Sequence, residues 1–97
     1  MDRARRNQRY IGEATNVAYA PSQIAAMTTD ISVTTQIPGA KVGDVALVTL
    51  ATPTALIVCD AYVSGPSTIT IRSTNVDPTN PHTPMATTAS AMVFRLI

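Results

Sequence analysis

Few side chains in this sequence have the types and spacing needed for covalent or acid–base chemistry. A nucleophilic site needs a serine or cysteine beside a base and an orienting group. The candidates for these roles are Ser64, Ser67, His82, Asp60 and Asp77. Neither serine lies in a G-x-S-x-G turn, and His82 stands between Pro81 and Thr83, where we expect a solvent-facing turn residue. The sequence therefore predicts no enzymatic activity.

Metal and cofactor patterns are also missing from the sequence. Cys59 is the only cysteine and His82 the only histidine, so neither a disulfide within the chain nor a Cys/His zinc site is expected. Cys59 lies mid-strand on an apolar face, which predicts an unreactive core thiol. The segment 39–44 (GAKVGD) lacks the G-x-x-x-x-G-K-[ST] spacing of a phosphate loop, and the aspartates are too dispersed for a calcium loop. No cofactor or metal is predicted.

The one concentrated charge lies at the start of the chain. Four arginines fall within residues 1–13, and two apolar side chains follow the last of them: Arg3, Arg5, Arg6, Arg9, Tyr10 and Ile11. Three interpretations are open: a solvated tail, an arm that docks on an acidic or carbonyl-rich protein surface, and a contact with nucleic acid. Stacking aromatics are scarce here, which argues against nucleic acid. The guanidinium fork suits carboxylates across protein interfaces, which favours docking.

Size and composition predict a body that needs partners. If residues 1–28 form the basic arm and lead-in, residues 29–97 form the body, and a domain of that size buries only about 60% of its unfolded surface. No disulfide or metal is expected to stabilise it, so we expect self-association, as a homotrimer or homodimer. Only 13% of residues are charged, against roughly 25% in an average soluble domain. No apolar run is long enough to cross a bilayer, so no membrane partner is expected.

The elements that would position these residues are strands. Five candidates cover residues 31–37, 45–50, 56–63, 68–74 and 90–97. They are separated by turn signals such as Pro38-Gly39 and Gly65-Pro66, a pattern typical of a sandwich or small barrel. Segment 45–50 (VALVTL) is apolar on both faces, so it is either a central strand or a strand covered by a partner.

Alternation predicts which side chains point inward. Those expected to do so are Ile31, Val33, Ile37, Ile57, Cys59, Ala61, Val63, Ile69, Ile71, Met92, Phe94 and Leu96. Those expected to face solvent include Asp60, Thr68, Thr70, Arg72 and Arg95. The predicted fold is all-β: a small β-sandwich or jelly-roll-like barrel of about five to seven strands with an extended N-terminal arm.

The stretches ISVTTQIPGAKVGDVALVTL, DAYVSGPSTITIRSTNVD and MVFRLI resemble small structural proteins of tailed-bacteriophage particles. In that group an alternating strand enters a P-G-A-x-x-G-D turn, and an apolar strand, a Y-V-S strand end and a T-I-T-I-R strand follow. The resemblance covers residues 31–97. It implies a capsid-associated protein, such as a cement (decoration) protein, without enzymatic activity.

The expected function is that of a virion structural protein that binds and stabilises the outer capsid shell. The expected partners are the major capsid protein and further copies of this chain, and the expected location is the capsid surface after synthesis in the host cytoplasm. Docking is assigned to Arg3, Arg5, Arg6, Arg9, Tyr10 and Ile11, and deletion of residues 1–12 is expected to leave the body folded. The alternative is a receptor- or glycan-binding β module of a phage tail or head fibre.

Overall fold

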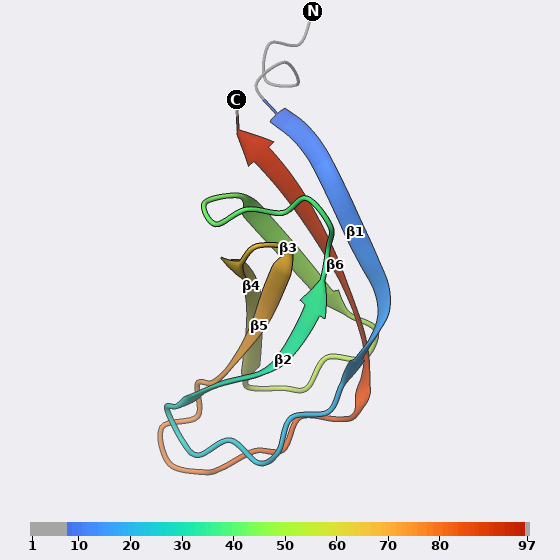
Figure 1. Ribbon diagram of the computed structural model, residues 1–97. Coiled ribbons are helices and arrows are strands. Elements are labelled where there is room, and N and C mark those ends of the chain that lie inside the picture. Colours follow the sequence, from blue (N-terminus) through green and yellow to red (C-terminus); the bar gives the residue numbers. More distant parts are fainter. Residues whose placement is uncertain (1–7, 97) are drawn as a thin grey trace, which may run out of the picture.

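Two three-stranded antiparallel sheets pack face to face (Figure 1). The computed structural model describes residues 8–96. The strands are β1 (Gln8–Tyr19), β2 (Thr29–Gln36), β3 (Val45–Leu50), β4 (Ile57–Gly65), β5 (Thr68–Asn75) and β6 (Thr87–Leu96). One sheet has the order β1-β6-β3 and the other β2-β5-β4. The described residues contain no helix, and the predicted small all-β sandwich is confirmed.

The chain crosses between the sheets three times before β4 and β5 form a hairpin. The hairpin turn is Pro66-Ser67, and Ser67 has a positive φ of 57°. The backbone of Ser67 also joins the neighbouring loop, since its N–H donates to the Ala40 oxygen (2.9 Å) and its oxygen accepts from the Ile37 N–H (2.9 Å). The hairpin tip is thereby fastened to the segment between β2 and β3.

Two clusters of buried side chains fill the space between the sheets. One consists of Ile37, Ala40, Val63, Ile69, Ala91 and Val93. The other consists of Tyr19, Val33, Ile71 and Ala89, with Cys59 packed against it. The Tyr19 hydroxyl satisfies its hydrogen-bonding capacity with Ser73 Oγ (2.7 Å) and Cys59 Sγ (3.3 Å). Burial and the Cys59 contact raise the pKa of Tyr19 to about 12, so it stays a neutral core residue.

All five predicted strands are present, but the sequence did not reveal β1. This strand pairs with β6 from Gln8↔Leu96 to Tyr19↔Thr87, inside the region 1–28 that was predicted to be arm and lead-in. The sheet therefore extends well before the predicted boundary at residue 29. The physical reason lies in the register shifts at Tyr10/Gly12 and Ala14/Val17, which disturb the two-residue alternation that identifies a strand.

A second irregularity turns Ile31 outward. The register of β2 against β5 shifts between Asp30 and Val33, and the Asp30 carboxylate accepts hydrogen bonds from the Ser32 backbone and hydroxyl. Val33 and Ile37 are buried as predicted, whereas Ile31 is 56% exposed. The prediction that Ile31 points inward is wrong because the bulge inserts residues that alternation does not count.

The facing of β6 is the reverse of the prediction. Ala89, Ala91 and Val93 are buried, and the alternate side chains point away from the core. Arg95, predicted to face solvent, lies on the inner side, where it donates to both Asp44 carboxylate oxygens (2.8 Å each) and to the Gly39 oxygen (3.0 Å). A charged residue can occupy this position because a carboxylate neutralises it at the open end of the sandwich.

Thr70 also differs from the prediction. Its position on the outer face of β5 is as expected, but it is only 5% exposed. β5 is the central strand of its sheet, and Thr70 Oγ1 donates to Ser64 Oγ on β4 (2.7 Å). Neighbouring strands therefore cover an outward-facing residue.

The Asp44–Arg95 pair predicts a specific acid sensitivity. The hydrogen bonds from Arg95 lower the pKa of Asp44 from 3.8 to about 2, so the pair stabilises the fold above about pH 4 and this contribution disappears as the pH falls toward 2. We expect Asp44→Asn to be less stable than the wild type at pH 7, and we expect the difference to shrink between about pH 4 and pH 2. Urea unfolding of both proteins across this range measures it. Unfolding midpoints that remain equally far apart at every pH would contradict the assignment.

Candidate functional site

The outer face of the β1-β6-β3 sheet carries exposed apolar side chains near the chain termini. We call this set the apolar patch; it consists of Tyr10, Val45, Leu47, Met92, Phe94 and Leu96. The strand register builds it, because residues directly opposite one another share a face of the sheet. One row across the sheet is Tyr10↔Phe94↔Val45, and the next places Met92 beside Leu47. Leu96 continues the patch opposite Gln8.

The apolar patch is large for so small a protein. Its exposed fractions range from 37% for Met92 to 67% for Leu96, while Phe94 is half-buried. The Tyr10 and Phe94 rings meet edge to face, with centroids 5.9 Å apart. The exposed parts add up to on the order of 500 Å², near the upper end of what soluble monomers leave uncovered, and such patches usually mark interaction sites.

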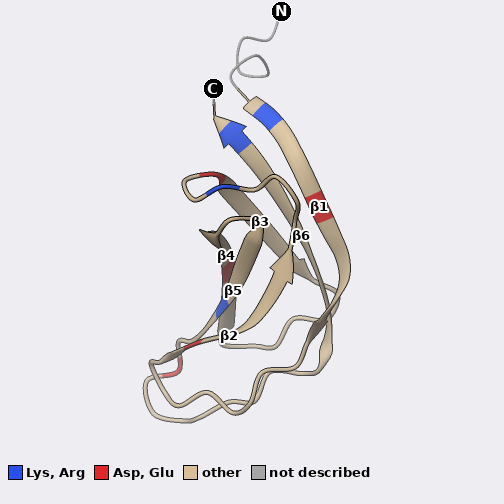
Figure 2. Ribbon diagram, in the orientation of Figure 1, with Lys and Arg blue, Asp and Glu red and all other residues tan. Residues whose placement is uncertain are grey.

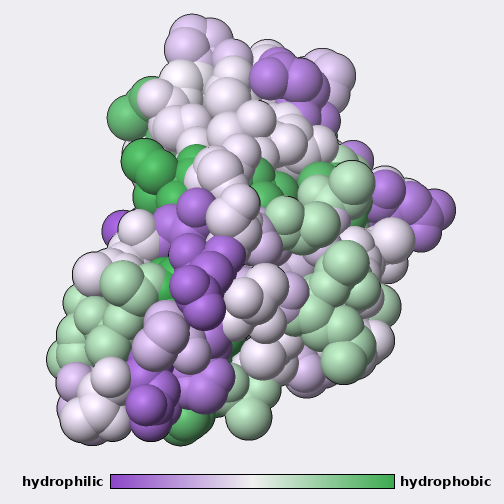
Figure 3. Space-filling view, turned by 90° about the horizontal axis from the view of Figure 1, so that it is seen from below, coloured by the Kyte–Doolittle hydropathy of each residue, from purple (hydrophilic) through white to green (hydrophobic). Residues whose placement is uncertain are grey.

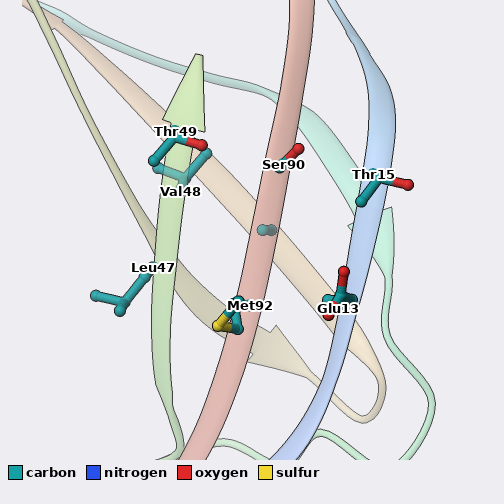
Figure 4. A pocket seen from close by; sticks show the side chains of 8 residues that line it. Glu13, Thr15, Leu47, Val48, Thr49, Ser90 and Met92 are labelled. Atoms are coloured by element: carbon teal, nitrogen blue, oxygen red, sulfur yellow. The ribbon is translucent and has the colours of Figure 1, made fainter. Parts of the chain in front are cut away.

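Small side chains border the apolar patch on the same face. The adjoining surface is a shallow hollow of about 180 Å³ between the three strands, with Thr15, Thr49 and Ser90 among its lining residues (Figure 4). Figure 4 also shows Leu47 pointing away from β6, over the free margin of β3. An apolar centre with a polar rim is the usual composition of a protein–protein contact surface.

Charge is sparse on this face. The register places Glu13 in the row of Met92 and Leu47, and β3 carries no charged residue (Figure 2). The Tyr10 hydroxyl donates to Glu13 Oε1 (2.6 Å), and this hydrogen bond raises the pKa of Tyr10. The carboxylate therefore fixes the Tyr10 side chain at the border of the apolar patch.

The outer face of the other sheet has a different character. Arg72 forms a two-pronged ion pair with Asp60, including Nε to Oδ1 at 2.9 Å, and its guanidinium lies 5.0 Å from the centre of the Tyr62 ring. Hydroxyl side chains such as Thr29 and Thr74 bond across the strands (3.0 Å). Val58 and Tyr62 are exposed on this face as well, but Asp60 lies between them on β4, so they form no continuous apolar surface.

A hydrogen-bonded loop follows β5 and contradicts the prediction for His82. Its Nε2 lies 2.8 Å from Asp77 Oδ2, and its backbone forms a two-way bridge with Ile24. Bonds from the Thr79 backbone and from His82 lower the pKa of Asp77 well below its usual range. His82 is thus a half-buried structural residue and not a solvent-facing turn residue. Tertiary contact with Ile24, which the local sequence does not reveal, holds it there.

The loop end of the molecule shows no comparable patch. Its exposed apolar side chains include Met27, Val76 and Met85. Hydrophilic side chains divide the apolar areas of this end from one another (Figure 3). The extended surface on the β1-β6-β3 sheet is therefore the stronger candidate for a functional site.

The structure places the described members of the predicted docking set at different sites. Arg3, Arg5 and Arg6 lie outside the described residues. Arg9 is exposed and lies opposite Arg95 in the register. Tyr10 belongs to the apolar patch, but Ile11 packs against the first core cluster and lies 3.6 Å from where a Cβ on Gly39 would sit. Ile11 thus serves the fold.

Five residues of the apolar patch were missed as functional candidates. Met92, Phe94 and Leu96 were predicted to point inward, and Val45 and Leu47 belong to the segment that was left undecided between a central strand and a strand covered by a partner. The sequence did hold one signal. Apolar residues occupy both odd and even positions of β6, so alternation alone cannot decide which set faces the core.

No protein-family model, curated protein or solved structure matches this chain. Within residues 8–96, no three His, Cys, Asp or Glu side chains gather in a way that could hold a metal ion. The same residues include no helix long and apolar enough to span a membrane. The site is therefore characterised by its own surface chemistry.

Proposed function

We propose that this chain is a structural protein of a tailed-bacteriophage particle that binds the outer capsid shell and cements it. The observation that supports this proposal most is the apolar patch, a large uncovered apolar surface on a protein with few charges. The sequence resemblance of residues 31–97 supplies the class of partner, the major capsid protein.

The proposed mechanism is stabilisation by mass action. A protein that binds only the assembled shell lowers the free energy of the assembled state and leaves the free subunits unaffected. The apolar patch would supply buried apolar contact, while Thr15, Thr49 and Ser90 would form the polar rim. Arg9 lies at the same end of β1, where it and the preceding arginines of the sequence could pair with carboxylates of the shell.

Truncation of the N-terminal segment is not a clean test of this role. Deletion of residues 1–12 would remove Gln8–Gly12 from β1 and take Ile11 from the core, so it would damage the sheet. A point substitution in the apolar patch is cleaner. Leu96→Glu places a charge at a position that is 67% exposed, and Val58→Glu does the same at 57% exposure on β4.

We expect Leu96→Glu to weaken binding to purified shells that lack this protein by at least tenfold and Val58→Glu to leave it unchanged. Burying an unpaired carboxylate in an apolar contact is costly, whereas a solvated one is not. Co-sedimentation with the shells measures binding, and thermal release of the packaged genome measures cementing. If the wild-type protein does not bind the shells, or if both variants bind as it does, the proposal is wrong.

A further inference from the structure

β3 lies at an edge of its sheet although its sequence lacks the usual protection of an edge strand. Segment 45–50 was predicted to be either a central strand or one covered by a partner, because it is apolar on both faces. The order β1-β6-β3 excludes a central position. Exposed edges promote pairing with other chains, and proteins protect them with charges, prolines and bulges.

The other three edge strands of residues 8–96 carry such protection. β1 has two register shifts, a positive φ at Asn16, and the charged residues Arg9 and Glu13. β2 has a register shift beside Asp30, and β4 has Asp60 and a register shift at Val63/Gly65. β3 pairs with β6 in unbroken register from Val45↔Phe94 to Leu50↔Ala89, and it contains no charge, proline or glycine.

The core is also incompletely closed beside β3. Its inward side chains, Ala46, Val48 and Leu50, are only half-buried, although they pack against the two core clusters. Its outward Leu47 is 54% exposed and leans over the free margin (Figure 4). An added strand would cover both the margin of the core and Leu47.

We propose that two copies of this chain associate through their β3 edges, forming one continuous six-stranded antiparallel sheet. A second copy suits this edge because β3 opposes no like charges when it pairs with itself. Residues that lie directly opposite one another in the joined sheet must point to the same face. With a two-fold axis between the copies, this holds when Leu47 lies opposite Leu47 of the partner, or when the pairing is shifted from that register by two residues. We adopt the first register, which brings together the two Leu47 side chains that lean over the margins (Figure 4).

This arrangement joins the apolar patches of the two copies into one surface. The outward pair Met92↔Leu47 of each copy would meet the same pair of the other copy, so the two patches become continuous through Leu47. The inference does not depend on the proposed function, because the isolated protein in solution tests it without shells.

Sedimentation equilibrium of Leu47→Lys and Met92→Lys separates edge pairing from stacking of the two patches. The two residues lie in the same row of the same face, but Met92 is on the central strand β6. We expect a dimeric wild-type protein, a dimeric Met92→Lys, and at least a tenfold weaker dimer for Leu47→Lys, because two ammonium groups would face each other. A monomeric wild type, or equal loss of dimer in both variants, would overturn the proposal.

Cross-linking tests the register itself. In a Cys59→Ser background, Leu47→Cys should form a disulfide-linked dimer on mild oxidation, since directly opposite residues have Cα atoms about 4.5–5.5 Å apart. Thr49→Cys on the same face is the control. In this register the two introduced cysteines, one in each copy, are four residues apart, about 13 Å along the strand. Cross-linking of Thr49→Cys instead, or of neither variant, would contradict the Leu47 register.

Discussion

Replacing Ile69 by alanine is expected to lower the free energy of unfolding by about 3 kcal/mol. Ile69 is fully buried on the central strand β5 and packs in the cluster with Ile37, Val63 and Val93. Removing three carbons there loses transfer free energy and leaves a cavity that the rigid sheets can fill only partly. In a domain of about 100 residues this corresponds to roughly 15 °C in melting temperature.

Ile31→Ala is the matched control for this experiment. It makes the same chemical change on a strand of the same sheet, but Ile31 lies within the β2 bulge and is 56% exposed. We expect a loss below about 0.5 kcal/mol, as for most surface substitutions. Urea unfolding at one fixed protein concentration compares the two variants, since self-association would contribute to apparent stability. Equal losses for Ile31→Ala and Ile69→Ala would contradict the described facing of β2.

The pair Ile31 and Ile69 also shows how far alternation predicts this fold. Runs of β-branched residues such as TITIR identify strands because those side chains suit a half-buried pleated surface. The inward side chains of β4 and the burial of Ile69 follow directly from the two-residue period. A bulge shifts that period by a residue, and its position depends on pairing with a strand distant in sequence. Ile31 and the whole of β1 could not be predicted for this reason.

The candidate site was hidden by a different physical effect. The charge of Arg95 was used to decide which face of β6 is exposed to solvent, since an isolated buried charge is strongly disfavoured. That rule fails when a partner neutralises the charge, and Asp44 lies 51 residues away along the chain. Once Arg95 turns inward, Met92, Phe94 and Leu96 must turn outward, and the apolar patch results. Charged residues at strand ends are therefore weak indicators of facing in small sandwiches.

Asn75→Ala is the second substitution expected to have a large effect, a loss of about 3 kcal/mol. Asn75 is fully buried at the end of β5. Its amide donates to the Ile24 oxygen (3.0 Å) and the Asn80 oxygen (2.9 Å), and its side-chain oxygen accepts from the Asp77 N–H (2.9 Å). Alanine would leave the Asn80 oxygen and the Asp77 N–H unpaired, and each buried unpaired group costs about 1–3 kcal/mol. The Ile24 oxygen would lose one of its two donors and keep the His82 N–H (3.0 Å).

Two further variants test the hydrogen bonding at this position. Asn75→Asp preserves shape and keeps an acceptor for Asp77, but it points a second oxygen at the carbonyls of Ile24 and Asn80. We expect it to be at least as unstable as Asn75→Ala, because the buried carboxylate is desolvated and repelled by these carbonyls, and stability equal to that of the wild type would contradict this assignment. Asn80→Ala, in the same loop, keeps the backbone oxygen that accepts from Asn75 and should cost little. Because Asn75 joins the segment before β2 to the loop before β6, its loss should first raise hydrogen exchange at Ile24 and His82, whose backbones bridge there.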